Sequence, residues 1–536
     1  MELDSMVFHY HESSREIFES APKIIMRYLF AFFCFVVCAF ADKPNVILIY
    51  VDDMGYGDAS CLNSKSKFKT PNIDRLAREG MTFTDGHSPD TVCTPSRYGL
   101  LTGRYSWRTT LKRGVMGAEG ACLIAEGRLT LASYLKANGY ATAMVGKWHL
   151  GMDFPGKKRT RDWNQPVKDM PLDKGFDYFW GIPASMNYGV LAWFEGRHAK
   201  VPPTLFTSKK PSKIAIDDYR IMPPYQKTPK EAPAPEESGG RKMSLKGRGL
   251  EVAQDFVDIE CLDRFTIRSL KWLERRAAAS RKGDPFFLYL PYTSPHKPVI
   301  PMAKFRGQGK AGAYGEFMIE TDWHIGRILK WLDDEKLAED TMVIFTSDNG
   351  PEKTWRKRKE LYGHRSSGIY REGKRSIYEG GHRVPFLVRW PAKVKANSKW
   401  NQPVCQTDLL ATFAQMFGKK LPENAGEDSD SFYDALTGIK ETVPRGPMVH
   451  HGSQGRFAIR EGKWKLVMED VRKNQRELYD LSSDPKETRN LISEYPDIER
   501  KLAAKLTALI NNGRSTPGKS QENDTPFWSD LVWMKQ

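Results

Sequence analysis

The sequence predicts an α/β fold in which helices flank a mostly parallel central sheet and a small C-terminal α+β domain carries an antiparallel sheet. Two observations lead to this prediction. Apolar, β-rich segments alternate with helical patterns up to about residue 441, and short paired strands and one helix follow. The 536 residues exceed one ordinary domain, and their 40% hydrophobic content is typical of a folded chain.

Residues 1–41 are predicted to form a signal peptide with an N-terminal extension. Their apolar run, 28–41, follows basic residues, ends on a small-x-small triplet and is short for a membrane span. Cleavage before Asp42 predicts an exported protein, periplasmic or secreted, with no membrane span in the mature chain. Two alternatives stay open: translation from Met26, and retention of the segment as an N-terminal anchor.

The predicted catalytic domain, 42–441, contains strands that end at polar side chains. The first strand, 46–51, is an apolar run that stops at Asp52 and Asp53. Later segments repeat this design: 140–151 ends at Lys147 and His149, 285–298 at His296, and 341–350 at Asp348 and Asn349. Because ligands bind such sheets at the carboxyl ends of the strands, we expect these polar residues to meet there.

Helical patterns separate these strands. Helices are predicted at 70–80, 129–139, 263–279 and 324–336, and a further strand at 383–391. The stretch 197–249 is rich in Lys, Pro, Gly and Ser, which predicts a surface insertion that either shapes a substrate cleft or is mobile.

The C-terminal domain and tail, 442–536, differ in pattern from the rest of the chain. Strand patterns at 456–467 and 477–481 precede a helical pattern at 498–513. This order is typical of a small α+β unit with an antiparallel sheet.

The acids at two strand ends predict a metal site. Adjacent Asp52 and Asp53 repel each other unless a cation neutralises them, and Asp348 with Asn349 adds a carboxylate and an amide. This all-oxygen set suits Ca²⁺ or Mg²⁺ and is poor for zinc. An Asp-Asp pair alone is more often a turn or a helix cap, but two such sets at analogous strand ends favour the metal.

The string "TVCTPSRYGL" places Cys93 at an unusual position in the chain. Pro95 fixes its own backbone and disfavours helix at Thr94, while the residues that follow look helical. Cys93 is therefore expected at or before a helix N-terminus, where negative charge is stabilised, with Arg97 about one turn further on. From these residues alone, a buried thiol, half of a disulfide, a metal ligand and a reactive precursor all stay open.

These motifs resemble, in content and order, the type I sulfatase family, arylsulfatase-like members of the alkaline phosphatase superfamily. Cys93-Thr94-Pro95-Ser96-Arg97 with "YGLLTGRY" resembles the family signature, in which the cysteine is oxidised to Cα-formylglycine. Further blocks from about residue 43 to about 490 agree: "VILIYVDDMGYGD", "TPNIDRLAREG", "GKWHLG", "TSPHKP", "FTSDNG", "GKRSIYEGGHRVP" and "ELYDLSSDPKETRNL". The resemblance implies an alkaline-phosphatase-like fold and hydrolysis of sulfate esters.

The resemblance also implies the cofactors. Asp52, Asp53, Asp348 and Asn349 match the ligands of a metal that is usually Ca²⁺, with the modified Cys93 beside them as a further ligand. Conversion of Cys93 to formylglycine (3-oxoalanine) implies a formylglycine-generating maturation enzyme as a partner.

Six more positions match catalytic or substrate-binding groups of the family. Arg97 and Lys147 match cations that steady the hydrated aldehyde and the sulfate, and His149 matches the base that serves the formylglycine. His296 and Lys374 match groups at the sulfate and the leaving oxygen. Ser185, in "GIPASMN", lies where some arylsulfatases place a further active-site residue, although its neighbours depart from that pattern.

The chemistry of the reaction agrees with these implied roles. A sulfate ester repels nucleophiles, so a metal, Arg and Lys are needed around its oxygens. A hydrated aldehyde offers one hydroxyl to attack sulfur, while His296 or Lys374 assists the leaving oxygen. Deprotonation of the second hydroxyl by His149 then expels sulfate, in two easier steps that a thiol could not complete.

The charge of the chain bears on its partners. Without residues 1–41, which hold three basic and five acidic side chains, the net charge rises from +16 to +18. An exported protein this basic attracts polyanions, which favours a sulfated carbohydrate as substrate and leaves a small sulfate ester possible; no nucleic-acid reading module is recognisable. A diffusely basic surface without a partner is the alternative.

Four cysteines besides Cys93 follow the predicted signal peptide. Cys61, Cys122, Cys261 and Cys405 are interpreted as buried thiols or as up to two disulfides.

A phosphodiesterase or phosphonate monoester hydrolase of the same superfamily is the nearest alternative to a sulfatase. A non-catalytic glycan-binding homologue is the other, and it predicts losses among the metal and cationic positions, of which the sequence shows none.

Overall fold

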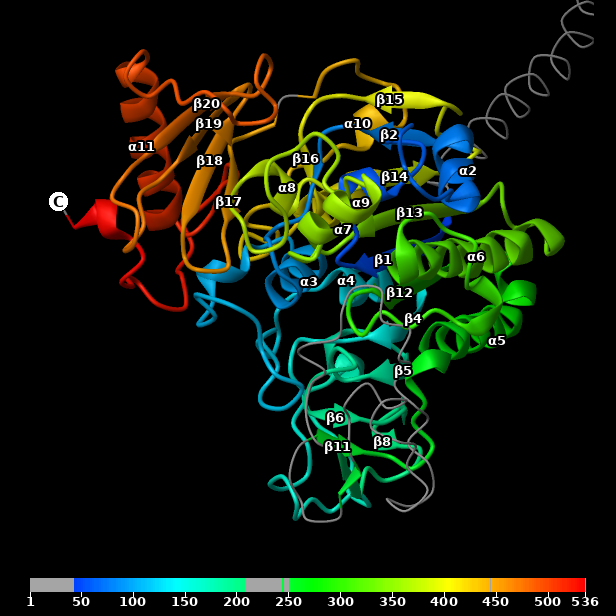
Figure 1. The fold of residues 1–536 in the computed structure, drawn as a ribbon. Coiled ribbons are helices and arrows are strands. Elements are labelled where there is room, and N and C mark those ends of the chain that lie inside the picture. Colours follow the sequence, from blue (N-terminus) through cyan, green and yellow to red (C-terminus); the bar gives the residue numbers. More distant parts are fainter. Residues whose placement is uncertain (1–42, 208–242, 245–249, 444, 536) are drawn as a thin grey trace, which may run out of the picture. The chain divides into compact units, whose positions relative to one another are not determined.

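The computed structural model describes residues 43–207, 243–244, 250–443 and 445–535, so the predicted signal peptide lies outside the described residues. Its main element is a ten-stranded sheet with the order β15-β2-β14-β13-β1-β12-β4-β5-β7-β8 (Figure 1). In that order the strands span Ser398–Trp400, Met81–Phe83, Phe386–Arg389, Thr341–Ser347, Asn45–Asp52, Phe286–Pro295, Ala141–Lys147, Tyr178–Ile182, Phe194–Glu195 and His198–Ala199.

The centre of this sheet is parallel. β13, β1, β12, β4 and β5 pair in parallel, whereas β14 runs antiparallel to β13 and β2, and β7 and β8 form an antiparallel edge. Every residue of β1 and β12 is buried, as the continuous apolar runs of these segments predict. The predicted α/β fold with a mostly parallel sheet is thus confirmed.

Two groups of helices cover the sheet. α2 (Pro71–Glu79), α5 (Cys261–Ser280) and α6 (Gly312–Asp334) pack together on one side, against β12 and β14. α3 (Cys93–Thr102), α4 (Leu131–Ala137) and α9 (Leu409–Met416) form a second group, which contacts the sheet through β4. None of the helices that the structure describes has the length and apolar character needed to span a bilayer.

The predicted insertion, 197–249, lies largely outside the described residues, but its flanks are ordered as strands. β9 (Leu205–Thr207), β10 (Met243–Ser244) and β11 (Leu250–Val252) pair with β6 (Val190–Leu191) in a four-stranded sheet. In Figure 1, β6 and β11 lie beyond β5 and beside β8, the edge strand of the central sheet.

The C-terminal residues form their own antiparallel sheet. β17 (Met448–His451), β18 (Phe457–Glu461), β19 (Trp464–Val467) and β20 (Glu477–Asp480) pair in chain order, and α11 (Pro496–Asn511) packs on β18 and β19. Tyr105 and Trp107 pack into this second core, so the segment after α3 shares buried contacts with the C-terminal sheet. The small antiparallel C-terminal sheet is therefore as predicted.

Candidate active site

The strand ends bring the predicted acids to one edge of the sheet. β1 and β13 pair with Val51 opposite Ser347, and on its other side β1 pairs Asp52 with Pro295 of β12. Asp53 follows with a positive φ of 70°, an uncommon conformation for a residue with a side chain. This bend keeps Asp53 at the edge beside the residues that follow β13.

Hydrogen bonds tie the acids to each other. The Asp53 backbone N–H donates to Asp348 Oδ1 at 3.1 Å, and Asn349 Nδ2 donates to Asp53 Oδ1 at 2.8 Å. Burial, followed by the neighbouring charge of Asp52, raises the pKa of Asp348 above its usual range. Carboxylates gathered in this way need positive charge nearby.

Three buried cations supply part of that charge. Lys147 Nζ donates to Asp52, Lys374 Nζ donates to Asp53, and Arg97 Nη2 lies 2.9 Å from Asp348 Oδ2. A second Arg97 nitrogen, Nη1, donates to the Lys147 carbonyl at 3.0 Å. The structure thus joins the predicted acids and cations in one network.

The donor set fits a hard divalent cation. Asp53 Oδ2 and Asn349 Oδ1 are buried oxygens without a hydrogen-bond partner among the described residues. Ligand atoms of Asp52, Asp53, Cys93 and His296 also lie within 4.8 Å of one another. Carboxylate and amide oxygens are the ligands that Ca²⁺ and Mg²⁺ prefer, so these residues match the predicted metal.

Cys93 is the first residue of α3, and its side chain lies at the centre of the network. Its Sγ is 3.3 Å from Lys374 Nζ and 3.6 Å from Asp52 Oδ1, and the residue is 2% exposed. Burial raises the pKa of the Cys93 thiol to about 12, against the opposing effect of Lys147 and Lys374. The unmodified thiol is therefore protonated at neutral pH and is a weak nucleophile.

His149 is held as a neutral ring with one free nitrogen. Its φ is 64°, and its Nε2 faces the Met116 carbonyl oxygen at 3.0 Å, which requires Nε2 to carry the proton. Nδ1 is buried without a partner among the described residues. Burial, with the charges of Lys147 and Arg97, keeps the pKa of His149 well below its ordinary value, so this nitrogen is available to accept a proton.

In His296 the other ring nitrogen, Nδ1, faces a backbone carbonyl oxygen and carries the proton. Its Nδ1 donates to the Lys297 carbonyl at 2.6 Å, and Nε2 lies 3.8 Å from Asp53 Oδ2. Burial lowers the pKa of His296, although the Asp53 carboxylate opposes this effect.

A pocket of about 290 Å³ opens over these residues. Its lining combines the predicted Cys93, His149, His296 and Lys374 with Val92, Gly114, Val115, Asn187, Tyr188, Lys297, Arg375, Ser453 and Gln454. Ser453 and Gln454 come from the turn between β17 and β18, so the C-terminal sheet contributes to the wall. No local pattern marks these further positions, because they lie in loops that only the tertiary structure brings together.

Ser185 is a predicted substrate-binding residue that does not line this pocket. The loop after β5 presents Asn187 and Tyr188 to the pocket, while Ser185 is 1% exposed and bonded through its carbonyl to the Tyr188 N–H at 2.9 Å. Asp52, Asp53, Arg97, Lys147, Asp348 and Asn349 are fully buried below the lining residues that they contact.

The cysteines of the described chain are all free thiols. Cys122, Cys261 and Cys405 are buried and Cys61 is exposed, so the buried-thiol interpretation fits three of these four, and the disulfide alternative is not realised.

A second cluster of metal-binding side-chain types lies outside this site. His87 of β3 (Gly86–His87), Glu379 and His382 of α8 (Glu379–His382), and His450 of β17 place ligand atoms within 4.8 Å of one another. Lys465 of β19 fills part of that space, 3.1 Å from His382 Nε2 and 3.0 Å from Glu379 Oε1. The cluster joins the central domain to the C-terminal sheet.

Comparisons with known proteins agree with this geometry. The family model described as Sulfatase matches residues 44–419, and that of the N-sulphoglucosamine sulphohydrolase C-terminal region matches 368–512. An N-acetylgalactosamine-6-O-sulfatase of Bacteroides thetaiotaomicron is 34% identical over 88% of this chain and 93% of its own length. Human arylsulfatase A is 32% identical over 90% of this chain and 92% of its own length.

Solved structures show the same relationship. A Bacteroides thetaiotaomicron structure described under the metabolism of multiple glycosaminoglycans superposes with a TM-score of 0.73 at 32% identity, over 87% of this chain and 99% of that one. The phosphonate monoester hydrolase of Agrobacterium radiobacter, at 18% identity and a TM-score of 0.55, shares the fold alone. The chain belongs to the sulfatase family, whose members hydrolyse sulfate esters.

Proposed function

We propose that this sulfatase removes sulfate from a sulfated carbohydrate, after export from the cytoplasm and conversion of Cys93 to formylglycine. The observation that carries the proposal is the meeting of Cys93, carboxylates and cations below one pocket at the carboxyl edge of the sheet. The relative of Bacteroides thetaiotaomicron that acts, by name, on N-acetylgalactosamine sulfate supports the carbohydrate.

The pocket wall supports a hydroxylated substrate. Asn187 Oδ1 and Ser453 Oγ are buried and have no hydrogen-bond partner among the described residues. A buried polar group without a hydrogen-bond partner destabilises the folded protein. The hydroxyls or amides of a bound sugar can supply the missing partners. The Tyr188 ring, 5.2 Å from the His149 ring, adds an aromatic face of the kind that packs on sugar C–H groups.

The residues around Cys93 would hold the sulfate group. A Ca²⁺ or Mg²⁺ ion held by Asp52, Asp53, Asp348 and Asn349 would supply positive charge to the sulfate oxygens. Lys374 Nζ, 3.3 Å from Cys93 Sγ, is within reach of a sulfate at the nucleophile. Lys147, fully buried beside Asp52, adds a second cation next to the carboxylates.

The reaction needs two proton transfers, and a different residue is the candidate for each. Formylglycine, once hydrated, supplies a hydroxyl nucleophile and a second hydroxyl whose deprotonation restores the aldehyde. His149 Nδ1 is the free nitrogen that accepts that proton.

For the leaving oxygen, Lys374 is favoured over His296 as the proton donor. Burial lowers the pKa of Lys374, but the nearby Asp53 carboxylate raises it well above its usual range, so the amine is protonated and has a proton to donate. The pKa of His296 is lowered by burial, so that ring is neutral.

The test compares substrates and the state of Cys93 in protein from its native host. We expect a higher kcat/KM for at least one sulfated monosaccharide than for an aryl sulfate, and an aldehyde mass in the peptide that contains Cys93. Cys93→Ala removes the nucleophile and is expected to lower kcat by about a thousandfold or more. An aryl sulfate that outperforms every sulfated sugar contradicts the substrate, and full activity with an intact thiol contradicts the modification.

A further inference from the structure

The outer wall of the pocket carries a pair of cations in addition to the deeper Lys147 and Lys374. Arg375 and Lys297 line the pocket, with side chains 43% and 44% exposed. Glu352, whose side chain is 9% exposed, contacts both of them. The deeper cations Lys147 and Lys374 already lie beside Cys93 and its carboxylate neighbours.

Glu352 fixes the guanidinium of Arg375 in a two-point contact. Arg375 Nη1 lies 2.6 Å from Glu352 Oε1, and Nη2 lies 3.0 Å from Oε2. Lys297 Nζ lies 3.7 Å from the same carboxylate. A planar guanidinium held in this way keeps its remaining N–H groups in fixed directions.

The backbone also fixes Arg375 at the pocket. Its φ is 77°, and its N–H donates to the Thr91 carbonyl at 2.9 Å, two residues before Cys93. The neighbouring Lys374 N–H donates to the Pro351 carbonyl at 3.0 Å. A residue other than glycine rarely adopts a left-handed backbone conformation. When one does so at an active site, either its function or the surrounding structure holds it there.

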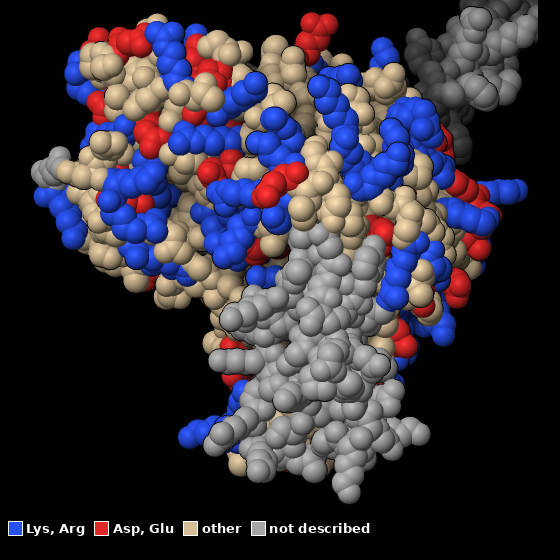
Figure 2. Space-filling model, in the orientation of Figure 1, with Lys and Arg blue, Asp and Glu red and all other residues tan. Residues whose placement is uncertain are grey.

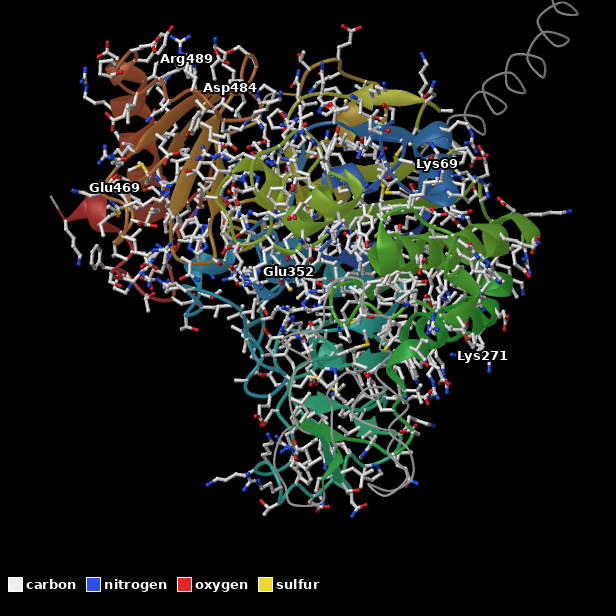
Figure 3. All side chains as sticks on the ribbon, viewed as in Figure 1. Lys69, Lys271, Glu352, Glu469, Asp484 and Arg489 are labelled. Atoms are coloured by element: carbon white, nitrogen blue, oxygen red, sulfur yellow. The ribbon has the colours of Figure 1, made fainter. Side chains whose placement is uncertain are left out.

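The charges at this wall do not cancel. One carboxylate, Glu352, faces two cations, so the rim keeps a surplus positive charge directed at the pocket. Figure 3 labels Glu352 in the middle of the face shown, and Figure 2 shows Lys and Arg gathered over much of this face. A preformed, half-exposed pair of cations of this kind suits a second anionic group on a bound substrate.

We propose that Arg375 and Lys297, held by Glu352, form a second anion subsite that binds an acidic group of the substrate other than the sulfate being removed. This inference rests on the proposed carbohydrate function and names its substrate class, a sulfated sugar with another anion nearby. A uronic-acid carboxylate and a second sulfate share the required chemistry.

The test measures kcat/KM for three probes that differ in their second anion. These are N-acetylgalactosamine 6-sulfate, its 4,6-disulfate, and a disaccharide that joins a uronic acid to the 6-sulfated sugar. We expect the wild type to prefer at least one dianionic probe over the monosulfate by about tenfold or more, because hydrogen bonds to charged groups contribute this much. The probe that gains the preference identifies the source of the anion.

Arg375→Gln is expected to reduce that preference about tenfold, chiefly through KM, and Arg375→Lys to restore part of it. Gln also has a Cβ, so the exchange adds no strain of its own at this φ. Turnover of the monosulfate by the same preparation reports a folded site, and Lys297→Gln provides a second variant in which the preference falls.

The matched control is Arg356→Gln. Arg356 lies on α7 (Trp355–Tyr362), its side chain is 55% exposed, and it pairs with Glu372 away from the pocket lining. The control is expected to keep the wild-type preference. A preference unchanged in Arg375→Gln, or a wild type that treats all three probes alike, overturns the subsite while sulfated-sugar hydrolysis itself stands. Failure of every sulfated sugar against an aryl sulfate contradicts the proposed function instead.

Discussion

Asp52, Asp53 and Asp348 form an unusual set of neighbours, because buried carboxylates repel each other. Lys147, Lys374 and Arg97 offset them, yet Asp53 Oδ2 and Asn349 Oδ1 still have no partner among the described residues. Oxygens left in this state are destabilising unless a ligand pairs with them. The proposed cation therefore has a structural role as well as a chemical one.

Chelation tests whether a bound cation stabilises these carboxylates. Removal of Ca²⁺ and Mg²⁺ with a chelator is expected to lower both activity and Tm, and added Ca²⁺ should restore them. An ion present at about a hundred times its Kd stabilises the folded state by about 2.7 kcal/mol. In Asp348→Asn the Tm should respond much less to Ca²⁺. A wild-type Tm that neither metal changes would contradict the metal site.

Among the connecting segments, the one between β13 and β14 is closely packed. The Gly350 N–H donates to the Gly381 carbonyl at 2.9 Å, and the Gly380 N–H donates to the Arg371 carbonyl at 2.8 Å. A Cβ at Gly380 would lie 2.4 Å from the Arg371 carbonyl oxygen. These contacts hold together the backbone that carries Asn349 and Lys374.

Gly380→Ala is expected to destabilise the protein by about 1–3 kcal/mol, because the added methyl must displace backbone atoms of this segment. The same displacement should lower kcat by moving Lys374. Gly117→Ala is the control, since a Cβ there meets no atom within 4 Å. Thermal unfolding and sulfate ester hydrolysis measure both effects. A Tm for Gly380→Ala equal to that of the control would show that this packing is not limiting.

For the molecule as a whole, local patterns predicted the strand ends but not the walls of the pocket. Asp52 and Asp348 follow apolar runs, so sheet geometry alone predicts that they meet. Asn187 and Ser453 follow no such run, and the turn that carries Ser453 reaches the site only through packing of the C-terminal sheet against the segment after α3. The flanks of the predicted insertion also pair as strands, a non-local contact that composition does not reveal.

Buried histidines lie where β3 and α8 meet the C-terminal sheet. The His382 and His450 rings stack with centroids 3.8 Å apart, and His87 Nδ1 lies 2.9 Å from His382 Nδ1. Asp85, Glu379, Glu487, Arg383, Arg460 and Lys465 surround them. Burial keeps the pKa of His450 well below its ordinary value, so the folded protein excludes a proton that the unfolded chain accepts.

The free energy of unfolding should therefore fall as the pH drops below about 6.5, the ordinary pKa of histidine, because the unfolded state then binds more protons. His450→Phe removes one such group and should flatten the dependence by up to about 1.4 kcal/mol per pH unit. His198→Phe, at an exposed position, is the control and should keep the wild-type slope. Denaturant unfolding between pH 7 and 5 gives the slopes, and identical slopes for all three proteins would contradict the assignment.

The turn that carries Ser453 and Gln454 affects how long the segment around Cys93 stays accessible during synthesis. Cys93 is almost fully buried in the finished fold, but the last part of the pocket wall is translated about 360 residues after it, roughly 20 to 70 s later at 5–20 residues per second. Until that turn docks, the nascent chain leaves the segment around Cys93 open on that side. The rate of synthesis downstream of Cys93 thus sets the shortest time for which that segment stays open to an enzyme that modifies it.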